Sequence, residues 1–188
     1  HLDLIAASFQ QIRTAQDRLA RHRLRRRITP ADLGPSHPLR SLIERWREVG
    51  AVWDRERLDG IIRSALDDRY VLASPSTTGN QVTICDVGSG YGLFNGSWLS
   101  RCRGLSMSDM PDYRYGRWVA DAHIEAAKDE EPLLEHVDVA ICWPRQEPRR
   151  HVYQRVILPV GTGKDRRLLS ASILDSALAF DVEAGDER

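Results

Sequence analysis

The sequence predicts an α+β fold whose C-terminal part forms an antiparallel sheet. Three segments alternate in polarity or are rich in β-branched residues: His136 to Trp143, His151 to Val160, and Arg167 to Leu174. The connections between them are too short to hold a helix, so neighbouring strands must run antiparallel. Apolar residues at helical spacing upstream of these strands predict amphipathic helices. These observations together define the class.

Composition indicates a cytoplasmic protein with one domain of ordinary size and an appendage. The 188 residues are 41% hydrophobic and 29% charged, and no apolar run approaches the roughly 20 residues that cross a bilayer. We therefore expect no membrane association. Cys85, Cys102 and Cys142 lack metal-ligand spacing and indicate reduced thiols. The chain begins at His1 without Met, so we expect a fragment of a longer protein.

The charges give no global field that would attract nucleic acid. There are 27 basic and 27 acidic residues, and the net charge is zero. Only Lys128 and Lys164 are lysines. We interpret this preference for arginine over lysine as the mark of a GC-rich genome first, and as a phosphate-binding surface only second. No nucleic-acid partner is predicted.

The first segment is predicted to be a helix. Its positions repeat at alternating spacings of three and four, namely Leu2, Ile5, Phe9, Ile12, Gln16 and Leu19. The helix could pack on its own domain or form the seam of a homodimer. Arginines then crowd around His22, from Arg18 to Arg27. Because no aromatic residues are interleaved, we interpret this run as a solvated helix end.

Proline and glycine between Ile28 and Pro38 predict a linker. Two helices should follow, one over Leu39 to Val49 and one capped by Asp54. The expected organisation is an N-terminal helix and linker with a dimerisation role over residues 1–36, a helical cap over 37–80, the main domain over 81–180 and a tail over 181–188.

The run Val82 to Asn95 fits two unrelated folds. Asp86 followed by Gly88, Gly90 and Gly92 resembles the first motif of S-adenosylmethionine-dependent methyltransferases. Alternatively, residues 82–85 form a strand, residues 86–90 a glycine turn, and residues 91–94 the returning strand of a hairpin. A methyltransferase sheet needs helices between parallel strands, for which the C-terminal connections leave no room. We therefore favour the hairpin.

The residues after Asn95 resemble the core of PAS sensory domains. An asparagine is followed by an aromatic residue, Trp98, three positions later and by Gly104 beyond a short helical segment. Over residues 81–174 the order of two strands, a helical middle and three strands is the PAS order. The middle includes a helix that Asp112 caps and that runs to about Lys128. The resemblance implies a five-stranded antiparallel sheet, helices on one face, a small-molecule pocket between them, and dimerisation through the N-terminal helix.

Four residues are candidates for ligand binding. His123 shares an inward helical face with Val119 and could ligate haem or bond a ligand, or it could be a satisfied buried histidine. Trp98 and Trp118 could fill the core or form a pocket wall, which would suit an apolar or aromatic molecule. Cys102 faintly resembles the reactive cysteine of flavin-binding photoreceptor PAS domains. The sequence identifies no cofactor.

No catalytic constellation is recognisable. A nucleophile elbow, metal-spaced His or Cys residues and a placed carboxylate pair are all missing from the sequence. Gly161 to Lys164 looks like a phosphate loop but lacks its spacing, so we interpret it as a hairpin turn.

The sequence thus predicts a PAS-like sensory module without catalysis of its own. It would bind a small ligand or protein partner and relay its state through the N-terminal helix to a signalling partner or output domain. The alternatives are a methyltransferase that uses residues 86–92 and a purely structural dimerisation domain.

Overall fold

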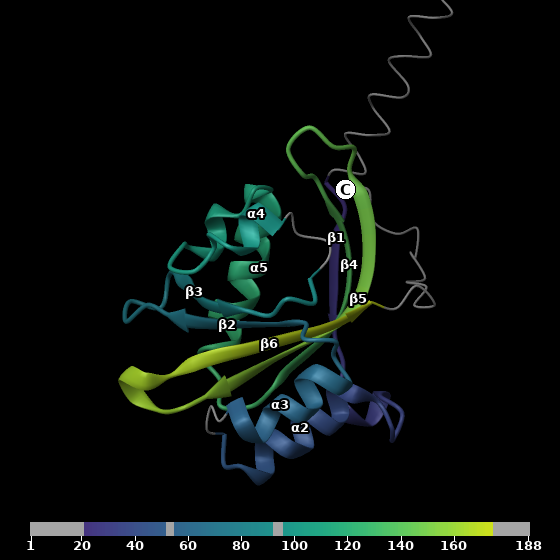
Figure 1. The fold of residues 1–188 in the computed structure, drawn as a ribbon, viewed down its shortest axis with the longest axis vertical. Coiled ribbons are helices and arrows are strands. Elements are labelled where there is room, and N and C mark those ends of the chain that lie inside the picture. Colours follow the sequence, from purple (N-terminus) through teal and green to yellow (C-terminus); the bar gives the residue numbers. More distant parts are fainter. Residues whose placement is uncertain (1–20, 52–54, 92–95, 175–188) are drawn as a thin grey trace, which may run out of the picture.

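A six-stranded antiparallel sheet forms the centre of the fold. The computed structural model describes residues 21–51, 55–91 and 96–174. The strands lie in the order β1-β4-β5-β6-β2-β3 (Figure 1). Their bounds are β1 Arg23–Arg27, β2 Tyr70–Pro75, β3 Val82–Val87, β4 Leu133–Ile141, β5 Arg149–Val160 and β6 Arg167–Leu174. The α+β class and the antiparallel pairing of the three C-terminal strands are confirmed.

The described helices follow the predicted pattern closely. They are α2 Pro38–Glu48, α3 Arg55–Ser64, α4 Gly96–Leu99 and α5 Tyr113–Ala126, with short 3-10 turns at Pro30–Asp32, Met107–Asp109 and Gly163–Asp165. As predicted, Asp112 is the N-cap of α5, and its carboxylate accepts hydrogen bonds from the backbone N–H groups of Arg114 and Tyr115. The predicted first helix and the cap residue Asp54 lie outside the described residues.

Helices cover both faces of the sheet, which corrects the expectation that they lie on one face. Along β2, β3, β4 and β5 the side chains are divided between two separate hydrophobic clusters. On one face α2 and α3 pack on Leu72, Val156 and Leu169, and the Trp46 indole donates a hydrogen bond to the Pro159 carbonyl at 2.7 Å. On the other face α5 packs on alternate residues such as Val137. Figure 1 shows the two helix pairs at different sides of the sheet.

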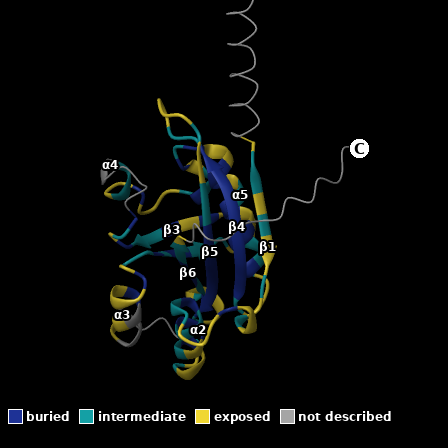
Figure 2. Ribbon diagram, turned by 90° about the vertical axis from the view of Figure 1, so that its right-hand side faces the viewer, coloured by how far each residue is buried: buried dark blue, intermediate teal, exposed yellow. Residues whose placement is uncertain are grey.

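The sixth strand is β1. It lies in the arginine run for which a solvated helix end was predicted, so that prediction is wrong. Arg23–Arg27 pairs antiparallel with β4 at the edge of the sheet. Figure 2 shows β1 mostly half-buried or exposed beside the buried strands β4 and β5. Arginine-rich segments have low β-propensity, so local preference does not explain this strand. Alternate arginines, Arg25 and Arg27, instead reach carboxylates on the α5 side of the sheet.

The turn predicted across residues 86–90 begins later than expected, because Asp86 and Val87 still belong to β3. β3 pairs antiparallel with β2, which precedes it in the chain, and the connection is the loop from Ser76 to Gln81. The segment expected to return, residues 91–94, lies mostly outside the described residues. The domain boundary proposed at residue 81 therefore falls inside a β-hairpin, and β2 belongs to the sheet and not to a helical cap.

The glycines after β3 allow a close backbone approach. A Cβ atom at Gly88 would lie 1.9 Å from the Asp68 carbonyl oxygen, and one at Gly90 would lie 1.7 Å from that of Asp67. The Gly88 N–H donates to the Tyr70 carbonyl at 2.9 Å, so this segment closes the open end of the β2–β3 hairpin. A nucleotide-binding glycine loop would need parallel neighbours, whereas the strand pairs that the structure describes are all antiparallel.

Gly90→Ala should lower the free energy of unfolding by about 2–3 kcal/mol, because the added methyl group overlaps a backbone carbonyl that cannot move aside. Gly60→Ala is the matched control. Gly60 lies within α3 with open space around it, so alanine should stabilise by about 0.5–1 kcal/mol through helix propensity. Urea denaturation measures both effects. Equal stability of Gly90→Ala and the parent chain would contradict the close approach.

Candidate functional site

A buried ion pair lies between α5 and the sheet. Arg155 of β5 and Glu135 of β4 are direct cross-strand partners and are 2% and 1% exposed. The Arg155 guanidinium donates through Nε and Nη2 to Glu135 Oε2, at 3.2 and 2.6 Å. Its central carbon lies 5.6 Å from the centroid of the Trp118 ring on α5. Such a pair is costly to desolvate, so charge pairing and the aromatic face must compensate for the loss of water.

A cavity of about 40 Å³ lies beside this pair. We call it the α5 cavity, and its polar lining consists of Tyr91, Tyr115, His123, Tyr153, Arg155, Ser170 and Ser172. Apolar residues complete the wall: Val71, Met107, Met110 and Val119. Since a water molecule needs roughly 10–15 Å³ of such volume, the cavity has room for a group the size of a few waters.

His123 presents an unpaired acceptor atom to this region. The ring is 1% exposed, and its Nδ1 lies 2.9 Å from the Val119 carbonyl oxygen. A carbonyl only accepts, so Nδ1 carries the proton and donates. Burial, assisted by the nearby Arg155 charge, lowers the pKa of His123 to about 3. The neutral ring therefore has a lone pair on Nε2, a buried atom without a hydrogen-bond partner in the described structure.

The tyrosines of the α5 cavity keep their protons. Burial raises the pKa of Tyr91 to about 12 and also raises the pKa values of Tyr115 and Tyr153. The Tyr115 and Tyr153 hydroxyls are 3.2 Å apart, and the Tyr91 hydroxyl lies 3.3 Å from Ser172 Oγ. These hydroxyls can both donate and accept, so the wall can adapt to either role in a guest molecule.

Alternating charges connect the α5 cavity to the sheet edge. Glu135 Oε1 accepts from Arg25 Nη1 of β1 at 3.0 Å, and Arg25 Nη2 donates to Glu125 Oε2 of α5 at 2.7 Å. Glu125 also accepts from Arg27 of β1. Burial would raise the pKa of Glu125, but the two arginines outweigh it and lower that pKa. We call Arg155, Glu135, Arg25, Glu125 and Arg27 the charge ladder.

The structure brings together two of the four predicted ligand-binding residues. His123 lines the α5 cavity, and Trp118 stacks on Arg155 and lies 6.4 Å from Tyr115 between ring centroids. Trp98 and Cys102 do not line it. Trp98 is partly buried and packs against the hydrophobic cluster on the α5 face of the sheet. The buried Cys102 thiol donates to the Leu99 carbonyl at 3.2 Å. Burial raises the pKa of Cys102, which opposes a reactive thiolate.

Sequence reasoning missed Arg155, Glu135 and the three tyrosines. Alternation in β5 offered a signal, since Tyr153, Arg155 and Ile157 share a face of an otherwise apolar strand. A charged residue at such an inward position indicates a partner on the next strand. Finding Glu135 also required the register of β4 against β5, which the sequence did not provide.

Asp86, the acidic residue of the methyltransferase interpretation, has structural partners. Its carboxylate accepts from the Tyr70 hydroxyl at 2.7 Å and pairs with Arg103 at 2.5 Å. Burial would raise the pKa of Asp86, but these partners outweigh it and lower that pKa. The carboxylate thus joins β2, β3 and the segment after α4.

Comparisons with known proteins found no matching family model, no similar curated protein and no similar solved structure. In the described part of the chain, no helix has the length and apolar character needed to cross a bilayer. Among the same residues, no three His, Cys, Asp or Glu side chains group so as to hold a metal ion. All three cysteines are free thiols.

Glu135→Gln should destabilise the fold by about 3–5 kcal/mol, because it leaves the Arg155 guanidinium buried without a charge partner. The double variant Glu135→Leu, Arg155→Met removes both charges and should recover most of that loss. Glu44→Gln, in the exposed Arg40–Glu44 pair of α2, is the control and should have almost no effect. Denaturant titration measures all three. A double variant no more stable than Glu135→Gln would contradict this account.

His123 should make stability depend on pH below neutrality. Its pKa is about 3 in the folded protein and near the ordinary 6.5 when unfolded, so the unfolded chain binds the extra proton between these values. The stability that neutral His123 contributes is fully present above pH 6.5. It falls as the pH decreases toward 3, by up to about 1.4 kcal/mol per pH unit. His123→Gln should flatten this slope between pH 6.5 and 5, where carboxylates contribute equally to both proteins. Identical slopes in denaturation at each pH would refute the assignment.

Proposed function

We propose that this chain is a PAS-like sensory module that binds a small polar molecule in the α5 cavity and transmits the bound state to β1. The observation that carries the proposal is the α5 cavity itself, which joins a buried ion pair to the unpaired Nε2 acceptor of His123. Unsatisfied buried polar atoms are rare in native proteins and each needs an explanation, and a guest in the cavity supplies one for His123.

The order of elements supports the family assignment. From β2 onward the chain runs through two strands, a helical middle and three strands, which is the PAS order, although the first two strands are β2 and β3 in place of the predicted residues 82–85 and 91–94. The middle ends in α5, which lies across the sheet (Figure 1). A pocket between this helix and the sheet is what the resemblance implies. β1 is an addition to the five strands of that pattern.

The lining defines the chemistry of the guest. Arg155 is neutralised by Glu135, and the phenols and His123 are uncharged, so the lining gives no net charge to attract an ion. His123 Nε2 requires a donor, whereas the tyrosine and serine hydroxyls offer both roles. A small neutral molecule with an N–H or O–H group satisfies this set. This preference replaces the larger apolar or aromatic ligand expected from the tryptophans.

The charge ladder provides the route of transmission. A guest that displaces the Arg155 side chain changes its bond to Glu135, and Glu135 holds Arg25 of β1. Movement of α5 acts on the same strand through Glu125. β1 follows directly on the N-terminal segment, for which the sequence predicts a signalling or dimer helix. Coupling of this kind is a free energy shared between two sites.

A nuclear magnetic resonance screen of small polar compounds tests binding and transmission together. A binder should shift the amide signals of α5 and β5 near the cavity and also those of β1. Glu125→Gln should reduce the β1 shifts while leaving the cavity shifts, because it weakens the ladder outside the cavity. Ser170→Leu should abolish both responses by filling the cavity.

Controls separate binding from transmission. Glu44→Gln on α2 lies outside the ladder and should respond like the parent chain. If compounds bind elsewhere and Ser170→Leu does not affect them, the cavity is not the sensory site. If cavity shifts occur and β1 never responds, the proposed route is wrong.

A further inference from the structure

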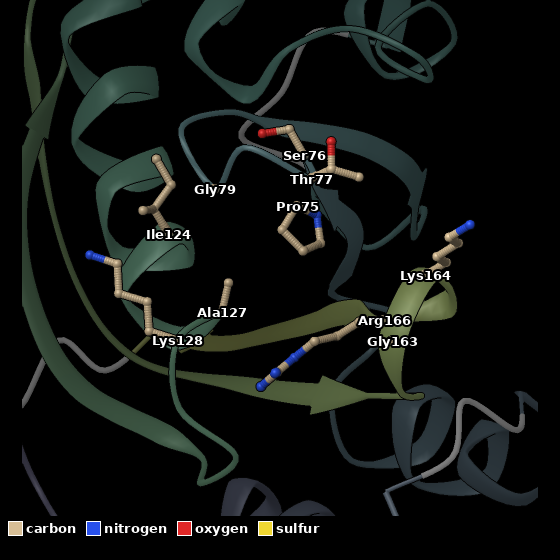
Figure 3. A pocket seen from close by; sticks show the side chains of 10 residues that line it. All are labelled: Pro75, Ser76, Thr77, Gly79, Ile124, Ala127, Lys128, Gly163, Lys164 and Arg166. Atoms are coloured by element: carbon tan, nitrogen blue, oxygen red, sulfur yellow. The ribbon is translucent and has the colours of Figure 1, made fainter.

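A second pocket lies on the surface at the C-terminal end of α5. Its volume is about 270 Å³, and three parts of the chain surround it. The lining residues are Ile124, Ala127 and Lys128 at the end of α5, Pro75, Ser76, Thr77 and Gly79 where β2 leads into the β2–β3 loop, and Gly163, Lys164 and Arg166 of the β5–β6 turn (Figure 3). It is separate from the α5 cavity, since the two share no lining residue.

The charges around this pocket are all of one sign. Lys128, Lys164 and Arg166 line it, and no lining residue is acidic. The chain as a whole has zero net charge, so three cations around one hollow depart from its average. Lys128 and Lys164 are also the only two lysines in the sequence. Figure 3 shows them on opposite sides of the pocket, with their amino groups pointing outward.

Arg166 adds an unsatisfied donor. One arm of its guanidinium donates to the Asp129 carbonyl just beyond α5. This contact offsets the partial negative charge of the helix end, which would otherwise repel an anion. The Arg166 Nε atom is buried and has no hydrogen-bond partner in the described structure. A buried N–H of a charged group is a strong hydrogen-bond donor, and leaving it without an acceptor costs free energy.

The remaining lining suits an organic anion. The Thr77 hydroxyl is a donor, and Pro75, Ile124 and Ala127 contribute apolar surface. The Ser76 hydroxyl already donates to Asn80 Oδ1 at 3.3 Å. The β5–β6 turn was predicted as a hairpin turn, and the structure confirms it, with positive φ at Gly161 and Gly163. Lys164 of this turn nevertheless lines the pocket. Phosphate is the anion that lysine point charges and hydroxyl donors commonly bind together.

We propose that this pocket binds a small organic phosphate. The volume is slightly below the roughly 300–1,000 Å³ of sites for drug-sized ligands, so a molecule no larger than a mononucleotide is expected. Its phosphate is attracted by the Arg166 guanidinium and by the Lys128 and Lys164 side chains, which turn inward to meet it, and its organic part covers Ile124 and Ala127. This site is independent of the proposed sensory function.

The two lysines make the site directly measurable. The full chain is treated with an amine-acetylating reagent with and without adenosine monophosphate, and mass spectrometry follows each amine. Bound phosphate should slow acetylation of Lys128 and Lys164 severalfold and saturably, while the α-amino group reacts at its normal rate. Sodium chloride of matched ionic strength controls for general screening.

Variants identify the contributing charges. Arg166→Gln should raise the half-protecting concentration roughly tenfold, because it removes a charge-assisted donor. Lys164→Gln changes an exposed side chain, leaves the fold intact and keeps Lys128 as the reporter, and should weaken protection similarly. Arg149→Gln, an exposed arginine at the other end of β5, should have no effect.

Three outcomes would overturn the proposal. Protection no greater than that given by sodium chloride means that no site exists. Equal protection of the α-amino group means that binding is nonspecific. Equal protection by inorganic phosphate and by adenosine monophosphate means that the pocket recognises free phosphate and not an organic phosphate.

Discussion

The buried pair of Arg155 and Glu135 is the constraint on which the sheet and the site both depend. Either residue alone would be an uncompensated charge in a nearly dry interior. The pair therefore favours one register of β4 against β5, because a slip of either strand by one residue would move that strand's charge to the opposite face, against α2 and α3, and separate the pair. The same requirement extends to β1, which is held at the edge by Arg25. A strand with low local propensity is thus retained by long-range charge pairing.

The two faces of the sheet have different roles, one in stability and the other in the proposed binding. The face under α2 and α3 is an apolar core, in which a fully buried leucine such as Leu42 contributes about 2 kcal/mol. The face under α5 also has an apolar cluster but contains the ion pair, the phenols and His123. The hydroxyls on this face can exchange donor and acceptor roles without moving, an option that a close-packed apolar core lacks. The sheet can therefore stay fixed while the α5 side responds.

The sequence was most informative where local chemistry decides the structure. The alternation of Val137 and Val139 and the capping residue Asp112 predicted β4 and α5 close to their observed bounds. It failed at β1, where arginine pairing with distant carboxylates overrides propensity. It failed again at Gly88, where the missing Cβ, and not the backbone freedom of glycine, lets another segment approach. Of the four predicted site residues, only His123 lines the α5 cavity. Helical spacing predicts that a side chain points toward the core. Which side chains from different elements then meet at one cavity is decided by the whole fold.

One turn of α5 connects every feature proposed for this protein. Successive residues of a helix point about 100° apart. His123 faces the α5 cavity, Ile124 lines the phosphate pocket, and Glu125 holds β1. A rigid-body shift of this turn would move all three side chains together, whereas a change of rotamer would move only one. Coupling between the two pockets would therefore require a ligand whose affinity differs between two positions of α5, and thermodynamic linkage would then make the effect equal in both directions. Without such a difference in affinity, each pocket works by itself.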